Sequence, residues 1–132
     1  MASEARYLLD TSVFLWAGGD SSKLSSFSLA AIEDESAVRL VSVASVWEMQ
    51  IKHGLGKLPL PEEANHLALR FMNRLSAEPL NISLDHIGRL YELPLVHRDP
   101  FDRILVAQAI AEKLTIISPD AALRAYPVNV LW

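Results

Sequence analysis

Short apolar runs alternate with longer amphipathic stretches along the whole chain. The runs are rich in leucine, isoleucine and valine, which is typical of short strands buried on both faces of a sheet. They predict strands at residues 6–10, 38–43, 79–82, 114–117 and 128–131. Helical spacing predicts a helix directly after the first strand and further helices at residues 26–34, 45–53, 62–76, 83–93, 99–113 and 120–125. This alternation predicts an α/β fold with a central, mostly parallel sheet and helices on both faces.

Capping residues mark where several of these helices should begin and end. Residues 10–12, Asp-Thr-Ser, supply capping side chains immediately after the first strand. Ser45 and Glu48 have the spacing of a capping box, and Gly54 stands where a left-handed residue usually ends a helix. Residues 99–100, Asp-Pro, suit the start of the longest apolar helix.

Length and composition narrow the class of protein. The 132 residues suit one compact domain spanning residues 1–132, and a hydrophobic content of 51% excludes a disordered chain. Twelve basic against 16 acidic residues give a net charge of −4, so any nucleic-acid site must be local. The absence of cysteine excludes disulfides, thiolate metal sites and cysteine nucleophiles. With no signal peptide or membrane span in the sequence, we expect a cytoplasmic protein.

Four acidic residues occupy the same kind of position relative to the predicted strands. Asp10 ends the first strand, Glu48 lies in the first turn after the second, Asp102 lies in the first turn of the longest helix, and Asp120 follows the fourth strand. In an open α/β sheet the carboxyl ends of the strands form the ligand crevice, so these acids are expected to converge. Taken singly, each is explained as well by helix capping.

Convergence of these acids would have a chemical consequence. Two carboxylates about 5 Å apart repel by about 3 kcal/mol at an effective dielectric near 20, whereas a helix dipole contributes only about 0.3–1 kcal/mol. A divalent cation is the natural remedy, and oxygen ligands favour Mg²⁺ or Mn²⁺ over zinc. Such an ion suits phosphodiester hydrolysis, because it stabilises charge on phosphoryl oxygens and activates water.

Four motifs together carry a family resemblance. They are Leu-Leu-Asp10-Thr-Ser, Ser45-Val-Trp-Glu48, His97-Arg-Asp-Pro-Phe-Asp102-Arg and Thr115-Ile-Ile-Ser-Pro-Asp120. In order and spacing they resemble the successive motifs of PIN-domain proteins, and are most similar to VapC-like toxins of bacterial type II toxin–antitoxin systems. The resemblance extends from Tyr7 to Trp132. It implies a metal-dependent endoribonuclease with Mg²⁺ or Mn²⁺ as cofactor.

The resemblance also implies roles for individual residues. Asp10 and Asp102 would be the principal metal ligands, Glu48 would bind the metal or orient its water, and Asp120 would complete the catalytic and metal-binding set. The hydroxyls that would hold these carboxylates belong to Ser12 and Ser118.

Two residues near the motifs are treated separately. Asp99 is assigned to capping, and Pro119 departs from the family's pattern by removing an amide donor from the turn before Asp120.

The resemblance also implies partners. They are an RNA substrate, a cognate VapB-like antitoxin lying across the active-site groove, and a second copy of the chain in a homodimer.

Basic and aromatic residues near the motifs can be explained with or without a role in binding RNA. Lys52, Lys57, Arg98 and Arg103 are candidates for holding RNA phosphates, although ordinary solvated charges are an equal explanation. Trp16, Trp47 and Trp132 are expected to pack in the core or at an interface.

The four histidines lack the spacing of a zinc pair. Structural or solvent roles are expected: His53 at a helix C-terminus, and His66 and His86 on surface helices. Only His97 lies near the acidic motifs, as a candidate substrate contact.

Two other classes of protein remain open. A non-catalytic Mg²⁺-binding regulatory module of doubly wound α/β type would have a similar acidic pocket, but it normally carries paired acids after its first strand and a lysine after its last. Here Thr11 follows Asp10, and residues 128–132 contain no lysine. An aspartyl-nucleophile phosphatase would require a second aspartate where this chain has Ser12. Labelling by a small phosphodonor would separate a regulator from a nuclease.

Overall fold

A five-stranded sheet forms the centre of the protein. The structure, a computed structural model, describes residues 4–132. Its strands lie in the order β3-β2-β1-β4-β5, and every neighbouring pair is parallel. Their bounds are β1 Arg6–Leu9, β2 Val38–Ser42, β3 Glu78–Leu80, β4 Thr115–Ile117 and β5 Asn129–Leu131. The predicted α/β class is confirmed, with a sheet that is entirely parallel.

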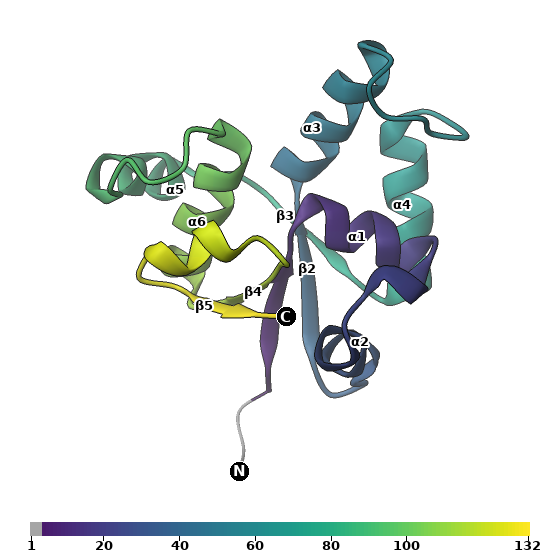
Figure 1. Cartoon of the computed structure of the whole chain (residues 1–132), viewed down its shortest axis with the longest axis horizontal. Coiled ribbons are helices and arrows are strands. Elements are labelled where there is room, and N and C mark those ends of the chain that lie inside the picture. The colour runs from purple at the N-terminus through teal and green to yellow at the C-terminus, as the bar shows by residue number, and fades with distance from the viewer. Residues whose placement is uncertain (1–3) are drawn as a thin grey trace.

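Helices cover both faces of this sheet (Figure 1). They are α1 Thr11–Gly18, α2 Ser26–Glu33, α3 Val43–Gly54, α4 Ala64–Leu75, α5 Leu84–Arg89 and α6 Pro100–Glu112, with short 3-10 turns at Ser21–Lys23, Leu90–Glu92 and Ala121–Ala125. Figure 1 shows α5 and α6 on one side and α1, α2 and α4 on the other. Within residues 4–132, none of these helices has the length and apolar character that crossing a membrane requires.

The register of the central strands fixes where the strand ends lie. Leu8 pairs with Ile116 and Leu9 with Ile117, and all four side chains are fully buried. Successive residues point to opposite faces, so Leu8 and Leu9 enter separate apolar layers. Burying one such side chain contributes about 1.5–3 kcal/mol, and a slip of one residue would exchange the two layers. The residues that follow β1 and β4 are therefore held side by side.

The start of α3 differs from the prediction. The helix begins at Val43, and its N-cap is Ser42, whose Oγ accepts a hydrogen bond from the Ala44 N–H at 3.1 Å. The predicted capping box of Ser45 and Glu48 is therefore wrong, and both residues lie buried inside the helix. The physical reason is that β2 passes into α3 without a loop, so the serine that ends the strand already accepts a hydrogen bond from one of the first free N–H groups of the helix.

The end of α3 also differs. Gly54 is the last helical residue, not a left-handed cap, and the positive φ of 73° belongs to Gly56. The chain keeps turning beyond the helix, with the Lys57 N–H donating to the Lys52 carbonyl at 2.9 Å, so the reversal occurs two residues later. By contrast, Asp99 caps α6 as expected.

Candidate active site

One serine ties together the ends of the two central strands. Asp10 follows β1, and its Oδ1 accepts a hydrogen bond from the Val13 N–H at 2.8 Å. Asp120 follows β4, and its Oδ1 accepts from the Ala122 N–H at 3.0 Å. Between them, the Ser118 hydroxyl donates to Asp10 Oδ2 and accepts from the Asp120 N–H at 3.0 Å. Both aspartates thus cap a helical turn while presenting a carboxylate at the same edge of the sheet.

Helices α3 and α6 bring further acids to this edge. Glu48 lies in the second turn of α3, and Asp102 lies in the first turn of α6. The site is at the topological switch point, where β1 has β2 on one side and β4 on the other. A cavity of about 200 Å³ is lined there by Asp10, Thr11, Ser12, Glu48, Lys52, Asp99, Asp102, Pro119 and Asp120. The structure therefore brings the four predicted acids together.

Asp99 is a fifth acid in this cavity. Its expected role was helix capping alone. Its Oδ1 does accept the Phe101 N–H at 2.9 Å, as a cap should. It also lines the cavity and acts electrostatically on Asp102. Because the N-terminus of α6 itself points into the site, one residue serves both purposes.

The crowding of acids changes their ionisation. Burial raises the pKa of Asp10, which is 8% exposed, against the hydrogen bonds from Ser118 and Val13 that lower it. Burial, followed by repulsion from Asp99, raises the pKa of Asp102 to about 7. A positive charge placed in the cavity would relieve this unfavourable concentration of negative charge.

Glu48 is oriented by two residues. The Thr11 hydroxyl donates to Glu48 Oε1 at 2.6 Å and lies 2.9 Å from the Ser45 hydroxyl. Lys52 Nζ lies 2.6 Å from Glu48 Oε2, and this hydrogen bond raises the pKa of Lys52. Sequence reasoning missed Thr11, whose only local signal is its position next to Asp10.

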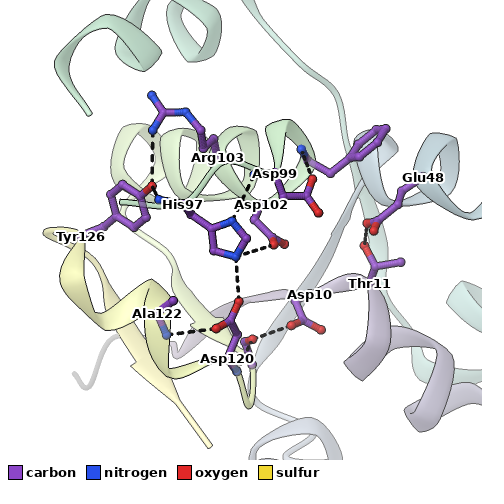
Figure 2. A network of polar contacts seen from close by, with 12 residues as sticks. Asp10, Thr11, Glu48, His97, Asp99, Asp102, Arg103, Asp120, Ala122 and Tyr126 are labelled. Carbon is purple, nitrogen blue, oxygen red and sulfur yellow. Dashed lines mark hydrogen bonds and ion pairs between the residues drawn. The ribbon is translucent and has the colours of Figure 1, made fainter. Parts of the chain in front are cut away.

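His97 lies between two of the acids (Figure 2). Its Nε2 atom is 3.1 Å from Oδ2 of Asp102 and 3.1 Å from Oδ2 of Asp120. These three side chains form a group whose ligand atoms all lie within 4.8 Å of one another. The sequence placed His97 near the site as a substrate contact and gave no sign that its ring would join two carboxylates.

Of the four residues predicted to contact RNA, one lines the cavity and three do not. Lys52 lines the cavity, whereas Arg98 and Lys57 are exposed outside it. The guanidinium of Arg103 has partners within the protein, the backbone carbonyls of Leu90 and Pro94 among them. Ser12, expected to hold a carboxylate, lines the cavity and is exposed.

One histidine prediction is wrong. His86 was expected on a surface helix, yet it is only 2% exposed. Its Nδ1 completes a capping box with Ser83, and its Nε2 lies 3.0 Å from Glu112 Oε1. The packing of α5 against α6 covers the ring, which local sequence does not encode. His53 lies in the last turn of α3 and His66 is exposed, as expected.

The tryptophans divide into two environments. Trp47 is 58% exposed and packs edge-to-face on Phe101, with ring centroids 5.3 Å apart. Core packing, one of the two expected roles, is therefore wrong for Trp47. Trp16 and Trp132 contact each other at a centroid distance of 6.0 Å and are partly buried.

Comparison with known proteins supports the α/β fold described above. The family model described as PIN domain matches residues 7–129. No curated protein matches the chain. Among solved structures, VapBC2 from Rickettsia felis, bound to a DNA fragment from their promoter, is similar with a TM-score of 0.73 and 18% identity, covering 96% of this chain and 97% of that chain. DNA-bound VapBC from Salmonella typhimurium gives a TM-score of 0.68 at 14% identity, with the same coverage of both chains. A toxin–antitoxin complex from Klebsiella pneumoniae gives 0.61 at 23% identity, covering 96% of each chain. At such identities the likeness concerns the fold.

Proposed function

The chain belongs to the PIN-domain family, and on that premise we propose that it is a metal-dependent endoribonuclease toxin that hydrolyses RNA phosphodiester bonds. The observation that carries the proposal is the meeting of five carboxylates in one cavity at the carboxyl edge of the sheet. A single capping aspartate needs no ligand. Five acids from the ends of β1 and β4 and from α3 and α6 repel one another, and a bound cation would offset that repulsion.

The donor set fits a hard divalent cation. The cavity offers carboxylate oxygens, and burial has already raised the pKa values of Asp10 and Asp102. Asp10, Glu48, Asp102 and Asp120 would hold Mg²⁺ or Mn²⁺, the ions that prefer such ligands. When bound, the ion supplies positive charge for the phosphoryl oxygens and lowers the pKa of a water molecule.

Other residues of the site orient the carboxylates or supply positive charge for the RNA phosphates. The hydroxyls of Thr11 and Ser118 donate to Glu48 and Asp10, and these hydrogen bonds orient the two carboxylates. Lys52, at the cavity wall, provides a positive charge for a phosphate beside the acids. In this proposal Arg98 and Lys57, both exposed outside the cavity, contact flanking phosphates, since a chain of net charge −4 needs local positive charges to bind RNA.

The proposed partners follow from the similar structures. Of the three similar structures named above, two are VapBC proteins bound to DNA and the third is a toxin–antitoxin complex. We extend this to a cognate VapB-like antitoxin that covers the groove and inhibits cleavage in the cytoplasm, and to a homodimer of this chain. Inducing the protein alone in a bacterial host should arrest growth. Coexpression of a cognate antitoxin should restore growth.

Cleavage of purified RNA is the direct test. The wild-type protein should cleave RNA with Mg²⁺ or Mn²⁺ and stop in EDTA, and Asp10→Asn and Asp102→Asn should each lose at least about 100-fold in rate. Asp85→Asn is the matched control, because its carboxylate is exposed on the surface of α5 beside Arg89. Activity retained in both site variants would refute the assignment. Metal binding without cleavage by the wild type would favour the non-catalytic module.

A further inference from the structure

The ring of His97 has a backbone N–H donor on one side and two carboxylate oxygens on the other. The backbone N–H of Asp99 lies 3.2 Å from His97 Nδ1 and points at it. A backbone N–H can only donate, so Nδ1 carries the lone pair and the ring proton resides on Nε2. Nε2–H then donates to Oδ2 of Asp120 at 3.1 Å, and Oδ2 of Asp102 lies at the same distance from Nε2 as a close electrostatic contact (Figure 2). In this orientation Nε2 is a hydrogen-bond donor and not a metal ligand.

The loop that carries His97 is fixed to the elements that carry those two aspartates. The His97 N–H donates to the hydroxyl of Tyr126 at 2.8 Å, and Tyr126 is buried just after the 3-10 turn that Asp120 caps. Arg103, on α6, lies 3.3 Å from the same hydroxyl and donates to the Pro94 carbonyl at 2.9 Å. Figure 2 shows this path from Arg103 through Tyr126 to His97. The position of His97 is therefore fixed both by α6, through Arg103, and by the segment after Asp120, through Tyr126.

We propose that His97 is a positioning residue of the acidic site: its Nε2–H donates to Asp120, its ring edge lies against the carboxylate of Asp102, and together these contacts keep both carboxylates directed into the cavity. The inference rests on the proposed function, since it concerns how the site is prepared for its cation. An ionised carboxylate has about four lone-pair sites, so accepting one N–H leaves others free for a metal. Groups that hold metal ligands in this way commonly contribute about 10- to 100-fold in metal affinity.

A different role for the same ring would have the opposite effect. If His97 merely occupied the place of the cation, its removal would free two carboxylates and tighten metal binding. If it positions the carboxylates, its removal lets Asp102 and Asp120 move apart under their mutual repulsion and weakens metal binding. The sign of the change in affinity therefore separates the two roles.

The test is Mn²⁺ binding to the full chain, measured by isothermal titration at one fixed pH. His97→Ala should weaken Mn²⁺ binding about 10- to 100-fold. His97→Gln places an amide N–H near the same oxygens and should recover most of the loss, which a purely structural role would not predict. His66→Ala, at an exposed position on α4, is the matched control and should bind as the wild type does. Thermal unfolding in EDTA checks that each variant is folded.

Two further measurements keep the proposal testable if His97→Ala unfolds. Tyr126→Phe keeps the buried ring, removes the hydroxyl that accepts from the His97 N–H, and should weaken Mn²⁺ binding by a smaller factor than His97→Ala. Nitrogen-15 NMR of the metal-free protein should show the tautomer protonated on Nε2, and a proton on Nδ1 would overturn the proposal.

The outcomes also separate this inference from the proposed function. Unchanged or tighter Mn²⁺ binding in His97→Ala, with binding and cleavage intact in the wild type, overturns the role of His97 alone. Absence of Mn²⁺ binding in the wild type overturns both.

Discussion

The carboxylate of Asp102 lies in a cavity that Asp99, Glu48 and Asp10 also line, and its pKa is raised to about 7. Between about pH 4 and 7 the folded protein therefore holds a proton on Asp102 that the unfolded chain, with an aspartate pKa near 3.8, has released. The folded state binds more protons in this window, so the free energy of unfolding falls as the pH rises through it. Asp10 shifts in the same direction.

We expect the metal-free protein to be less stable at about pH 8 than at about pH 5, with Asp102 contributing on the order of 2–4 kcal/mol of the difference. Asp102→Asn should remove this contribution, because the amide cannot ionise. Urea denaturation in EDTA at several pH values measures both proteins. A pH dependence that is the same in the wild type and the variant would contradict the ionisation described here.

Arg39 is a second residue whose contribution to stability depends on its hydrogen-bond partners. It is buried on β2, and its guanidinium donates to the carbonyls of Leu75 at 2.8 Å, Asp34 at 2.7 Å and Ile32 at 3.2 Å. It thereby satisfies acceptors near the ends of α2 and α4 with one planar group.

Truncating Arg39 should be costly. Arg39→Ala leaves the buried Ile32 carbonyl and two part-buried carbonyls without this donor, and should lower the free energy of unfolding by about 3 kcal/mol. Arg39→Lys should recover little, because an ammonium cannot span these three carbonyls. Arg124→Ala, at an exposed position, is the control and should change stability by less than about 0.5 kcal/mol. Urea unfolding curves compare the four proteins.

At the scale of elements, α1 and α4 approach closely where Gly18 ends α1. A Cβ added to Gly18 would lie 2.2 Å from the ring of Phe71 on α4, which is closer than nonbonded atoms allow. Phe71 also packs edge-to-face against Phe14 of α1, so the ring has little freedom to move away. The absence of a side chain at Gly18 therefore sets the distance between the two helices.

Gly18→Ala should destabilise the protein by about 1–3 kcal/mol through this overlap. The double variant Gly18→Ala with Phe71→Leu should show a smaller combined loss than the sum of the two single variants. Gly54→Ala is the control: its added Cβ meets no atom of residues 4–132 within 4 Å, and alanine in α3 should be neutral or stabilising by up to about 1 kcal/mol. Thermal unfolding measures each variant, and equal effects at the two glycines would contradict the packing argument.

At the scale of the whole molecule, the acidic site joins segments far apart in the sequence. Asp10 and Asp120 follow β1 and β4, and Glu48 and Asp102 lie on α3 and α6, so the four acids converge only in the folded chain. A cation bound there would bind the folded state alone and would oppose unfolding of all four segments together.

Adding Mn²⁺ at about 100 times its dissociation constant should raise the free energy of unfolding by about 2.7 kcal/mol. The double variant Asp10→Asn with Asp120→Asn should show no such gain, while Asp85→Asn should behave as the wild type does. Thermal unfolding with Mn²⁺ and with EDTA provides the comparison. A wild-type melting temperature that is unaffected by Mn²⁺ would contradict a cation site at this edge of the sheet.

Much of the fold follows from patterns that are local in the sequence. Apolar runs such as residues 38–43 and 114–117 predict buried strands, since each run carries its own propensity and periodicity. Asp99 beside Pro100 predicts the start of α6, because capping depends on neighbouring residues. The positions of Asp10 and Asp120 at strand ends predict their meeting, because parallel strands present their carboxyl ends at one edge.

Contacts between distant segments were decided only by the tertiary structure. The sequence does not tell which ring enters the acidic cavity, yet His97 lies 23 residues from Asp120 in the chain and 3.1 Å from it in space. Nor does it reveal that α5 and α6 bury His86 or that Trp47 stays exposed. Periodicity, capping and strand ends are properties of neighbouring residues, whereas a side chain's partners and burial depend on how the elements dock.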